Sequence, residues 1–148
     1  MTRRANDAKT AQEAEVADRI EAAGLRRVPG RTIPNMDKAP LVGEFCAAEC
    51  LVGTRKADLT VRLFDGRLMP IECKVSNSST NSIKRLNNDA AVKAKTWIAE
   101  FGSLGVVPVA VLSGVFKVKN LEQAQTPGLT LFWAHNLDRL IDFIVSKK

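Results

Sequence analysis

The sequence contains few of the residues on which several kinds of catalytic site depend. Its 148 residues include one histidine, His135. No Gly-rich phosphate-binding loop and no nucleophile elbow is present, and a single histidine cannot form a histidine-based pair. The remaining candidates for catalytic groups are therefore carboxylates and lysines.

Cysteine is also scarce, and its spacing is poor for a zinc site. Cys46 and Cys50 are separated by three residues, and Cys73 leaves the count odd. No second pair of ligands lies near the first two in the sequence. We therefore expect reduced thiols in the core.

Long apolar runs are missing as well. No run approaches the ~20 residues of a membrane-spanning helix, and the first ten residues lack the apolar centre of a signal peptide. These absences predict a soluble cytoplasmic protein, and the length predicts a single domain over residues 1–148. The net charge of +6 suits a polyanionic partner, although a surface made soluble by lysine is the alternative interpretation.

Two short extended segments around an Asp-Gly turn form the feature on which the rest of the chain is organised. Apolar residues alternate with polar ones over 59–63, Asp65 and Gly66 supply a turn, and 68–75 is again extended in pattern. This arrangement is typical of a β-hairpin.

Acidic residues lie on both arms of this hairpin. Asp58 opens the first arm, and Glu72 and Lys74 share one face of the second because side chains alternate along a strand. Pairing through the turn can bring Asp58 beside both Glu72 and Lys74. Two close carboxylates suit Mg²⁺ or Mn²⁺, and a neighbouring lysine can orient or deprotonate water or stabilise charge on phosphorus. The hairpin thus predicts metal-assisted phosphodiester hydrolysis; charges solvated or paired at the surface are the alternative.

The series Asp58, then Ile71-Glu72-Cys73-Lys74, resembles the signature of the PD-(D/E)XK nuclease superfamily. The resemblance implies that Asp58 and Glu72 bind Mg²⁺, with Mn²⁺ able to substitute, and that the backbone carbonyl of Cys73 is a further ligand. It also implies that Lys74 is the catalytic lysine. Ala57 replaces the proline of the signature, which is often absent in the superfamily.

A longer stretch, from Asp58 through ECKVSNSSTNSIKRLN to Trp97, is similar to XamI-type restriction endonucleases. This similarity implies a Mg²⁺-dependent endodeoxyribonuclease that cuts double-stranded DNA as a homodimer, since a palindromic site needs two copies of one active site. Two alternatives stay open. One is a structure-specific resolvase of branched, Holliday-junction-type DNA, and the other is a nuclease-fold protein that binds DNA without cleaving it.

Two further glutamates are candidate accessory acids. Residues 6–24 are predicted to form a helix with a narrow apolar stripe, and Glu13 lies on the same side as that stripe. The superfamily resemblance makes Glu13 a candidate for the metal site, whereas an ion pair with Lys9 one turn earlier is the alternative. Glu44 lies just ahead of the hairpin in 41–52, a segment whose pattern does not distinguish helix from strand.

Candidate DNA contacts follow the hairpin. The polar run 75–82 offers hydrogen-bonding groups for a phosphate or a base edge, and the helix predicted over 83–101, with Ser82 as its N-cap, has a basic face opposite its apolar one. A solvated loop and a solvated helix face are the alternatives. The candidates are Ser76, Asn77, Lys84, Arg85, Asn88 and Lys95.

The remaining pattern completes an α/β fold. An irregular segment is predicted over 26–40, strands over 106–116 and 129–134, and a last helix beginning after an Asn136 cap. Together these elements predict a mixed sheet of about four or five strands flanked by helices. This is the restriction-endonuclease-like core that the resemblance implies.

Overall fold

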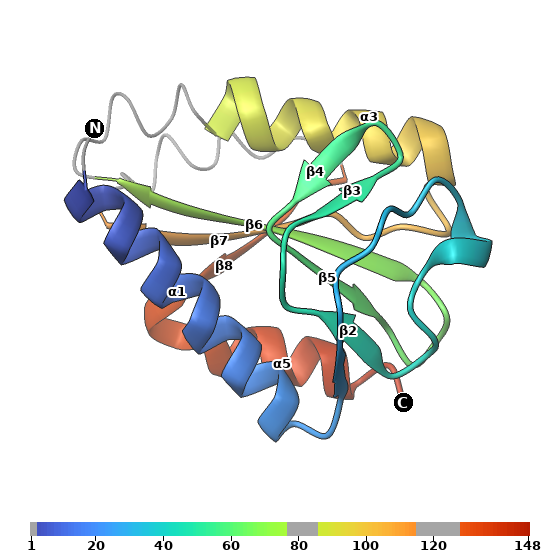
Figure 1. Cartoon of the computed structure of the whole chain (residues 1–148), viewed down its shortest axis with the longest axis horizontal. Coiled ribbons are helices and arrows are strands. Elements are labelled where there is room, and N and C mark those ends of the chain that lie inside the picture. The colour runs from blue at the N-terminus through green and yellow to red at the C-terminus, as the bar shows by residue number, and fades with distance from the viewer. Residues whose placement is uncertain (1–2, 77–85, 115–127) are drawn as a thin grey trace.

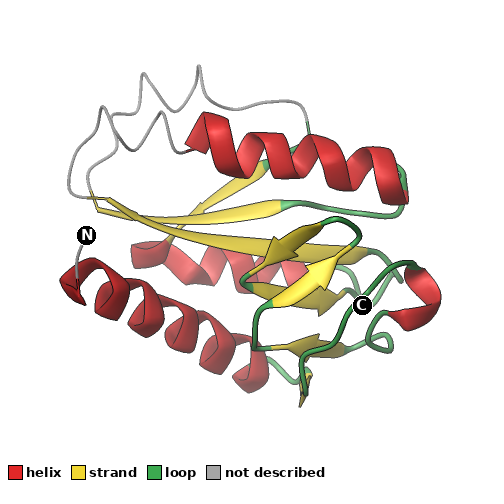
Figure 2. Ribbon diagram, turned by 45° about the horizontal axis from the view of Figure 1, so that its top comes forward, coloured by secondary structure: helices red, strands yellow, loops and turns green. Residues whose placement is uncertain are grey.

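The computed structural model describes residues 3–76, 86–114 and 128–148. A mixed sheet forms the middle layer, with α1 and α5 on one face and α3 with the small β3–β4 hairpin on the other (Figures 1 and 2). The predicted α/β class with a restriction-endonuclease-like arrangement is confirmed. The elements are α1 (Arg3–Ala22), β1 (Arg26–Val28), η1 (Met36–Lys38), β2 (Glu44–Cys46), β3 (Cys50–Val52), β4 (Arg55–Ala57), β5 (Leu59–Arg62), β6 (Leu68–Ser76), η2 (Leu86–Ala91), α3 (Val92–Phe101), β7 (Val109–Gly114), β8 (Thr130–Trp133), η3 (Ala134–Asn136) and α5 (Leu137–Val145).

The main sheet has the strand order β1-β2-β5-β6-β7-β8. The β5 strand is antiparallel to both of its neighbours, whereas β6, β7 and β8 run parallel. Among the described residues the sheet has six strands rather than four or five, because β1 and β2 arise from segments without a clear strand pattern. The strand β1 is mostly exposed and only three residues long, so its extended form depends on pairing with β2.

The predicted hairpin is confirmed as β5 and β6. Leu59 pairs with Ile71 and Arg62 with Leu68, so the register places Asp58 opposite Glu72. The connection is stabilised at Asp65, whose Oδ1 accepts a hydrogen bond from the Arg67 backbone N–H at 3.1 Å. The sequence thus predicts the hairpin, whereas its register comes from the structure: the Leu63 backbone N–H donates to the Arg67 carbonyl, so Phe64 joins Asp65 and Gly66 in the connection.

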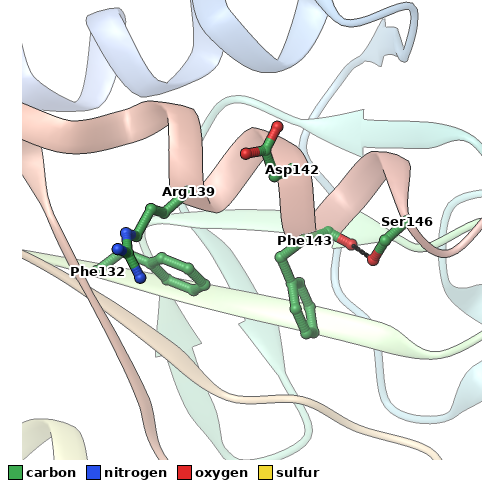
Figure 3. A pocket seen from close by; sticks show the side chains of 5 residues that line it. All are labelled: Phe132, Arg139, Asp142, Phe143 and Ser146. Carbon is green, nitrogen blue, oxygen red and sulfur yellow. Dashed lines mark hydrogen bonds between the residues drawn. The ribbon is translucent and has the colours of Figure 1, made fainter.

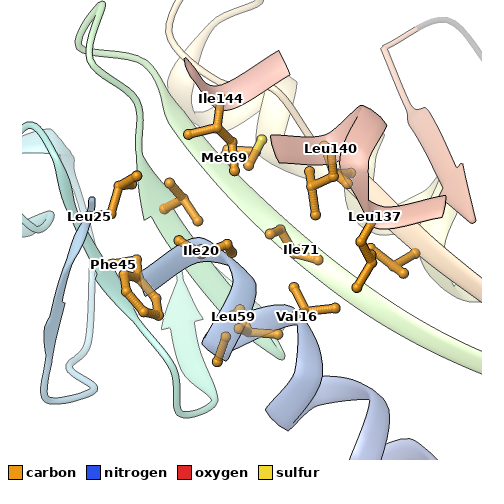
Figure 4. Packing of buried hydrophobic residues seen from close by; sticks show 14 of the residues in the cluster. Val16, Ile20, Leu25, Phe45, Leu59, Met69, Ile71, Leu137, Leu140 and Ile144 are labelled. Carbon is orange, nitrogen blue, oxygen red and sulfur yellow. The ribbon is translucent and has the colours of Figure 1, made fainter. Parts of the chain in front are cut away.

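The principal core lies between the sheet and the pair of helices α1 and α5 (Figure 4). The predicted apolar stripe of α1 is confirmed at Val16 and Ile20, both fully buried. Full burial of one such side chain stabilises the fold by about 1.5–3 kcal/mol. This packing holds α1 across β6, and it is the contact that brings the first half of α1 to the acidic hairpin.

Two helix ends differ from the sequence prediction. The described part of the predicted 83–101 helix begins with a π-helical turn, η2, before the regular α3, and the predicted Ser82 cap lies outside the described residues. Asn136 precedes α5, but its side chain makes no capping hydrogen bond. The 3₁₀ turn η3 leads the chain directly into α5, so a side-chain cap is not needed there. No helix in the described ranges is long and apolar enough to cross a membrane.

The turn of the β3–β4 hairpin requires glycine at position 53. Gly53 has φ +59°, and a Cβ there would contact the Glu100 carboxylate. We expect Gly53→Ala to lower the free energy of unfolding by about 1–2 kcal/mol, because L-residues are strained in this region. Urea denaturation measures the change. The same substitution in a Glu100→Ala background removes the contact and isolates the backbone cost; no loss in either background would contradict the prediction.

Candidate active site

The acid pair, Asp58 and Glu72, lies where β6 extends beyond the end of its neighbour β5. The β6 strand continues to Ser76, whereas its neighbour β5 begins only at Leu59, directly after β4, which pairs with β3 in the separate two-stranded sheet. Asp58 lies at this junction, and its Oδ2 accepts a hydrogen bond from the Cys73 backbone N–H at 2.8 Å. The carboxylate therefore takes the place of a strand neighbour, which fixes it against the edge of β6.

Asp58 also contacts the first helix. Asp58 is only 8% exposed, and its Oδ2 lies 3.3 Å from Lys9 Nζ. Lys9 Nζ is in turn 3.9 Å from Glu13 Oε2, so the predicted Lys9–Glu13 pair is present. Burial and then the nearby Asp58 charge raise the pKa of Glu13. The structure thus brings Glu13 to Asp58 as well as to Lys9.

Glu72 is the most deeply buried carboxylate of the site, at 2% exposed. Its Oε1 lies 2.5 Å from Lys93 Nζ, which also donates to the Lys56 carbonyl at 2.9 Å. Its Oε2 is buried and has no hydrogen-bond partner in the described part of the chain. Burial, followed by repulsion from Asp58, raises the pKa of Glu72 despite the opposing charge of Lys93.

Lys74 lies two residues further along β6, on the same side of the strand as Glu72. Its Nζ is 3.0 Å from Asp89 Oδ2 in η2, and its side chain is largely buried. Burial alone would raise the pKa of Asp89, but the ammonium of Lys74 outweighs it and lowers that pKa. The predicted catalytic lysine is therefore held beside the acid pair by a partner from the following helix.

The other predicted site residues are placed differently. Glu44 lies in β2, where its Oε1 accepts from the Leu41 backbone N–H at 2.8 Å and its Oε2 is 3.9 Å from Arg26, so the structure does not bring it to the acid pair. Lys95 is exposed on α3, Ser76 ends β6 and Asn88 lies in η2. Asn77, Lys84 and Arg85 lie outside the described residues.

The sequence prediction did not include Asp89 and Lys93, which contact Lys74 and Glu72, nor the buried Gln12 of α1. Gln12 is buried in α1 and donates from Nε2 to the Val111 carbonyl at 3.0 Å. Helical periodicity could have indicated Lys93, because it lies three residues after Ala90 and four before Trp97 and therefore on the apolar face of its helix. A cation at that position must find a partner near the sheet. The three cysteines lie buried as free thiols, as expected.

The carboxylates of the acid pair have the chemistry of Mg²⁺ ligands. Within residues 3–76, 86–114 and 128–148, no group of three or more His, Cys, Asp or Glu residues forms a ready-made metal cluster. Mg²⁺, however, usually binds through one or two carboxylates and keeps several waters. Asp58 and Glu72 repel each other, and one buried Glu72 oxygen lacks a partner among the described residues. These two residues therefore fit Mg²⁺, with the other positions left to water and substrate.

A hollow elsewhere on the molecule lies between β8 and α5 (Figure 3). Ser146 at its rim donates a hydrogen bond from Oγ to the Phe143 carbonyl at 2.7 Å. Neither Asp58, Glu72 nor Lys74 lines it; the lining residues are Phe132, Arg139, Asp142, Phe143 and Ser146. The residues that the sequence predicts to be catalytic thus lie on the β5–β6 hairpin and not at this hollow.

The mixed sheet and the acidic hairpin define a restriction-endonuclease-like α/β protein. A family model described as XamI restriction endonuclease matches residues 1–133, and the chain belongs to this family. The Type II restriction enzyme XamI of Xanthomonas campestris pv. amaranthicola is 56% identical over 107 residues, which are 72% of this chain. The chain spans 39% of the length of that relative. No solved structure matches the chain.

Proposed function

We propose that the protein is a Mg²⁺-dependent endodeoxyribonuclease that hydrolyses phosphodiester bonds as type II restriction enzymes do. The observation that carries the proposal is the buried pair Asp58 and Glu72, joined by the hairpin register and flanked by Lys74. The relative named as a type II restriction enzyme supports the same activity. We infer cleavage of DNA and not binding alone, because a protein that only binds DNA does not need two acids and a lysine together.

In this proposal each residue of the hairpin has one task. Asp58 and Glu72 hold Mg²⁺, and the Cys73 carbonyl is a further ligand. The ion supplies stabilisation of the charge that builds on the phosphoryl group. Lys74 orients the attacking water, for which its ammonium group must leave Asp89. To take the proton of that water, Lys74 must first lose a proton to solvent and react as the neutral amine. Hydrolysis leaves a 5′-phosphate and a 3′-hydroxyl.

Glu13 is proposed as an accessory acid of the same site. It lies beside Lys9 and Asp58, and its raised pKa reflects burial next to another carboxylate. Such a group can hold a water or a second cation near the phosphate. Glu44 has no corresponding contact with the acid pair, because its carboxylate is used by Leu41 and Arg26.

The proposed partner is double-stranded DNA in the cytoplasm, bound by a homodimer. The net charge of +6 favours association with a polyanion, and two copies would match the two strands of a palindromic site. Backbone phosphates are the proposed targets of the residues that follow the hairpin, since basic and polar side chains position DNA without reading its sequence. These residues are Ser76, Asn77, Lys84, Arg85, Asn88 and Lys95.

Metal removal tests this proposal directly. Supercoiled plasmid incubated with the purified protein in Mg²⁺ is expected to give discrete fragments, and EDTA is expected to abolish them, because two carboxylates without a cation cannot neutralise the transition state. A four-way junction in the same buffer is the second substrate. Cleavage of the junction alone would replace restriction by resolution of branched DNA. Binding of both substrates without cleavage of either would contradict nuclease activity.

A further inference from the structure

Two lysines approach the acid pair from opposite faces of the sheet. Lys9 comes from α1 and lies 3.3 Å from Asp58 Oδ2. Lys93 comes from α3 and lies 2.5 Å from Glu72 Oε1. Neither belongs to the hairpin, yet each contacts one of the two proposed metal ligands.

The charges of this cluster are nearly balanced before any metal binds. Asp58, Glu72 and Glu13 contribute three negative charges, and Lys9 and Lys93 contribute two positive ones. A divalent ion placed between the acids would lie close to both ammonium groups, and like charges at such distances repel strongly in a partly buried site. Metal and ammonium groups therefore compete as counter-ions of the same two carboxylate groups.

The lysines, and not the acids, are able to move away. The carboxyl groups of Asp58 and Glu72 are almost completely buried, and Asp58 is fixed by the Cys73 N–H. The side chains of Lys9 and Lys93 are 40% and 22% exposed, respectively, and long flexible stems let both ammonium groups reach solvent. Lys93 would give up one carboxylate contact and one hydrogen bond to the Lys56 carbonyl.

We propose that Lys9 and Lys93 are resident counter-cations, which neutralise the acid pair in the metal-free protein and which a divalent ion must displace. The inference rests on the proposed metal site at Asp58 and Glu72. It predicts that these lysines weaken metal binding while stabilising the metal-free fold. If Lys93 only oriented Glu72, removing Lys93 would weaken Mg²⁺ binding, because a misplaced Glu72 binds metal less well.

Titration calorimetry with Mg²⁺ alone, without DNA, measures this competition. Lys93→Met and Lys9→Met are each expected to tighten Mg²⁺ binding by roughly three- to tenfold, the size of a modest coupling between two ligands. Lys93→Arg keeps the charge and is expected to stay near the wild-type affinity. The matched control is Lys38→Met, at an exposed lysine of η1, which is expected to leave the affinity unchanged.

Thermal unfolding of the same variants provides the second measurement. Both Met variants are expected to unfold at lower temperature without metal and to gain more from Mg²⁺ than the wild type does. Lys9 is the more exposed of the two, so its variant keeps the test valid if Lys93→Met folds poorly. Equal or weaker Mg²⁺ binding in folded Lys9→Met and Lys93→Met would overturn the inference.

Failure of the inference can be separated from failure of the proposed function. If Glu72→Gln abolishes Mg²⁺ binding but the lysine variants do not tighten it, the metal site stands and the counter-cation role is wrong. If the wild type binds no Mg²⁺, or Glu72→Gln binds it equally well, both proposals are overturned.

Discussion

Replacing Glu72 by glutamine is expected to remove DNA cleavage and at the same time to stabilise the protein at neutral pH. The variant keeps the size of the side chain but loses the charge that would hold Mg²⁺, so cleavage should fall by at least roughly 100-fold. The gain in stability follows from burial, because a carboxylate that is 2% exposed and lies near Asp58 is costly to ionise. A site built for a cation thus lowers the stability of the metal-free fold.

The pH dependence of this effect has a definite sign. The folded-state pKa of Glu72 is raised above the ordinary value of 4.5, so folding favours its protonated form. The stability that this group contributes is present below pH 4.5 and is lost as the pH rises through its folded pKa. Below pH 4.5 the wild type and Glu72→Gln should therefore unfold at similar temperatures, and the variant should be the more stable one once the pH exceeds the folded pKa.

Thermal unfolding between pH 4 and pH 8, together with a plasmid cleavage assay, checks both parts. Glu21→Gln removes an exposed carboxylate of α1 that pairs with Arg27, and it is the matched control for loss of one negative charge. A Glu72→Gln variant that still cuts DNA would exclude Glu72 from the metal site. A variant less stable than the wild type at pH 7 would mean that the Lys93 pair outweighs the cost of burial.

Trp97→Ala is expected to cause the largest loss of stability, about 3–5 kcal/mol. Trp97 is fully buried, and its Nε1 donates to the Val52 carbonyl at 3.0 Å. Its neighbours in the second core cluster include Val52 and Ala57 of the β3–β4 hairpin and Leu68 of β6, together with Ile33 and Val106, which form isolated β-bridges to Val52 and Leu68. One side chain therefore joins α3, which carries Lys93, to the hairpin that carries the Lys56 carbonyl.

Urea denaturation of Trp97→Ala and Trp97→Phe separates the two contributions of this residue. Phenylalanine keeps much of the apolar volume but leaves the Val52 carbonyl without this donor, at a cost of about 1–3 kcal/mol. The alanine variant should lose considerably more, since a cavity remains. A loss below about 1 kcal/mol for alanine would contradict the assignment of Trp97 as the anchor of α3.

The acid pair itself could be predicted from local pattern. Alternation along the arms and the turn at Asp65 and Gly66 predict the hairpin, and the register seen in the structure puts Asp58 opposite Glu72. The apolar stripe of α1 and the faces of α5 follow equally from helical periodicity. Short strands such as β1 could not be found in this way, because three residues carry too little periodicity and depend on a neighbour for their extended form.

The amino-acid sequence by itself determined the hairpin and the shared face of Glu72 and Lys74, because those relations span few residues and follow from strand alternation. Only the tertiary structure decided that Asp58 lies opposite Glu72 and is fixed by the Cys73 N–H. It also decided that Lys9 and Lys93 meet these two carboxylates from opposite faces of the sheet. Periodicity indicates which way a side chain points from its own element. The packing of distant elements decides which group it meets there.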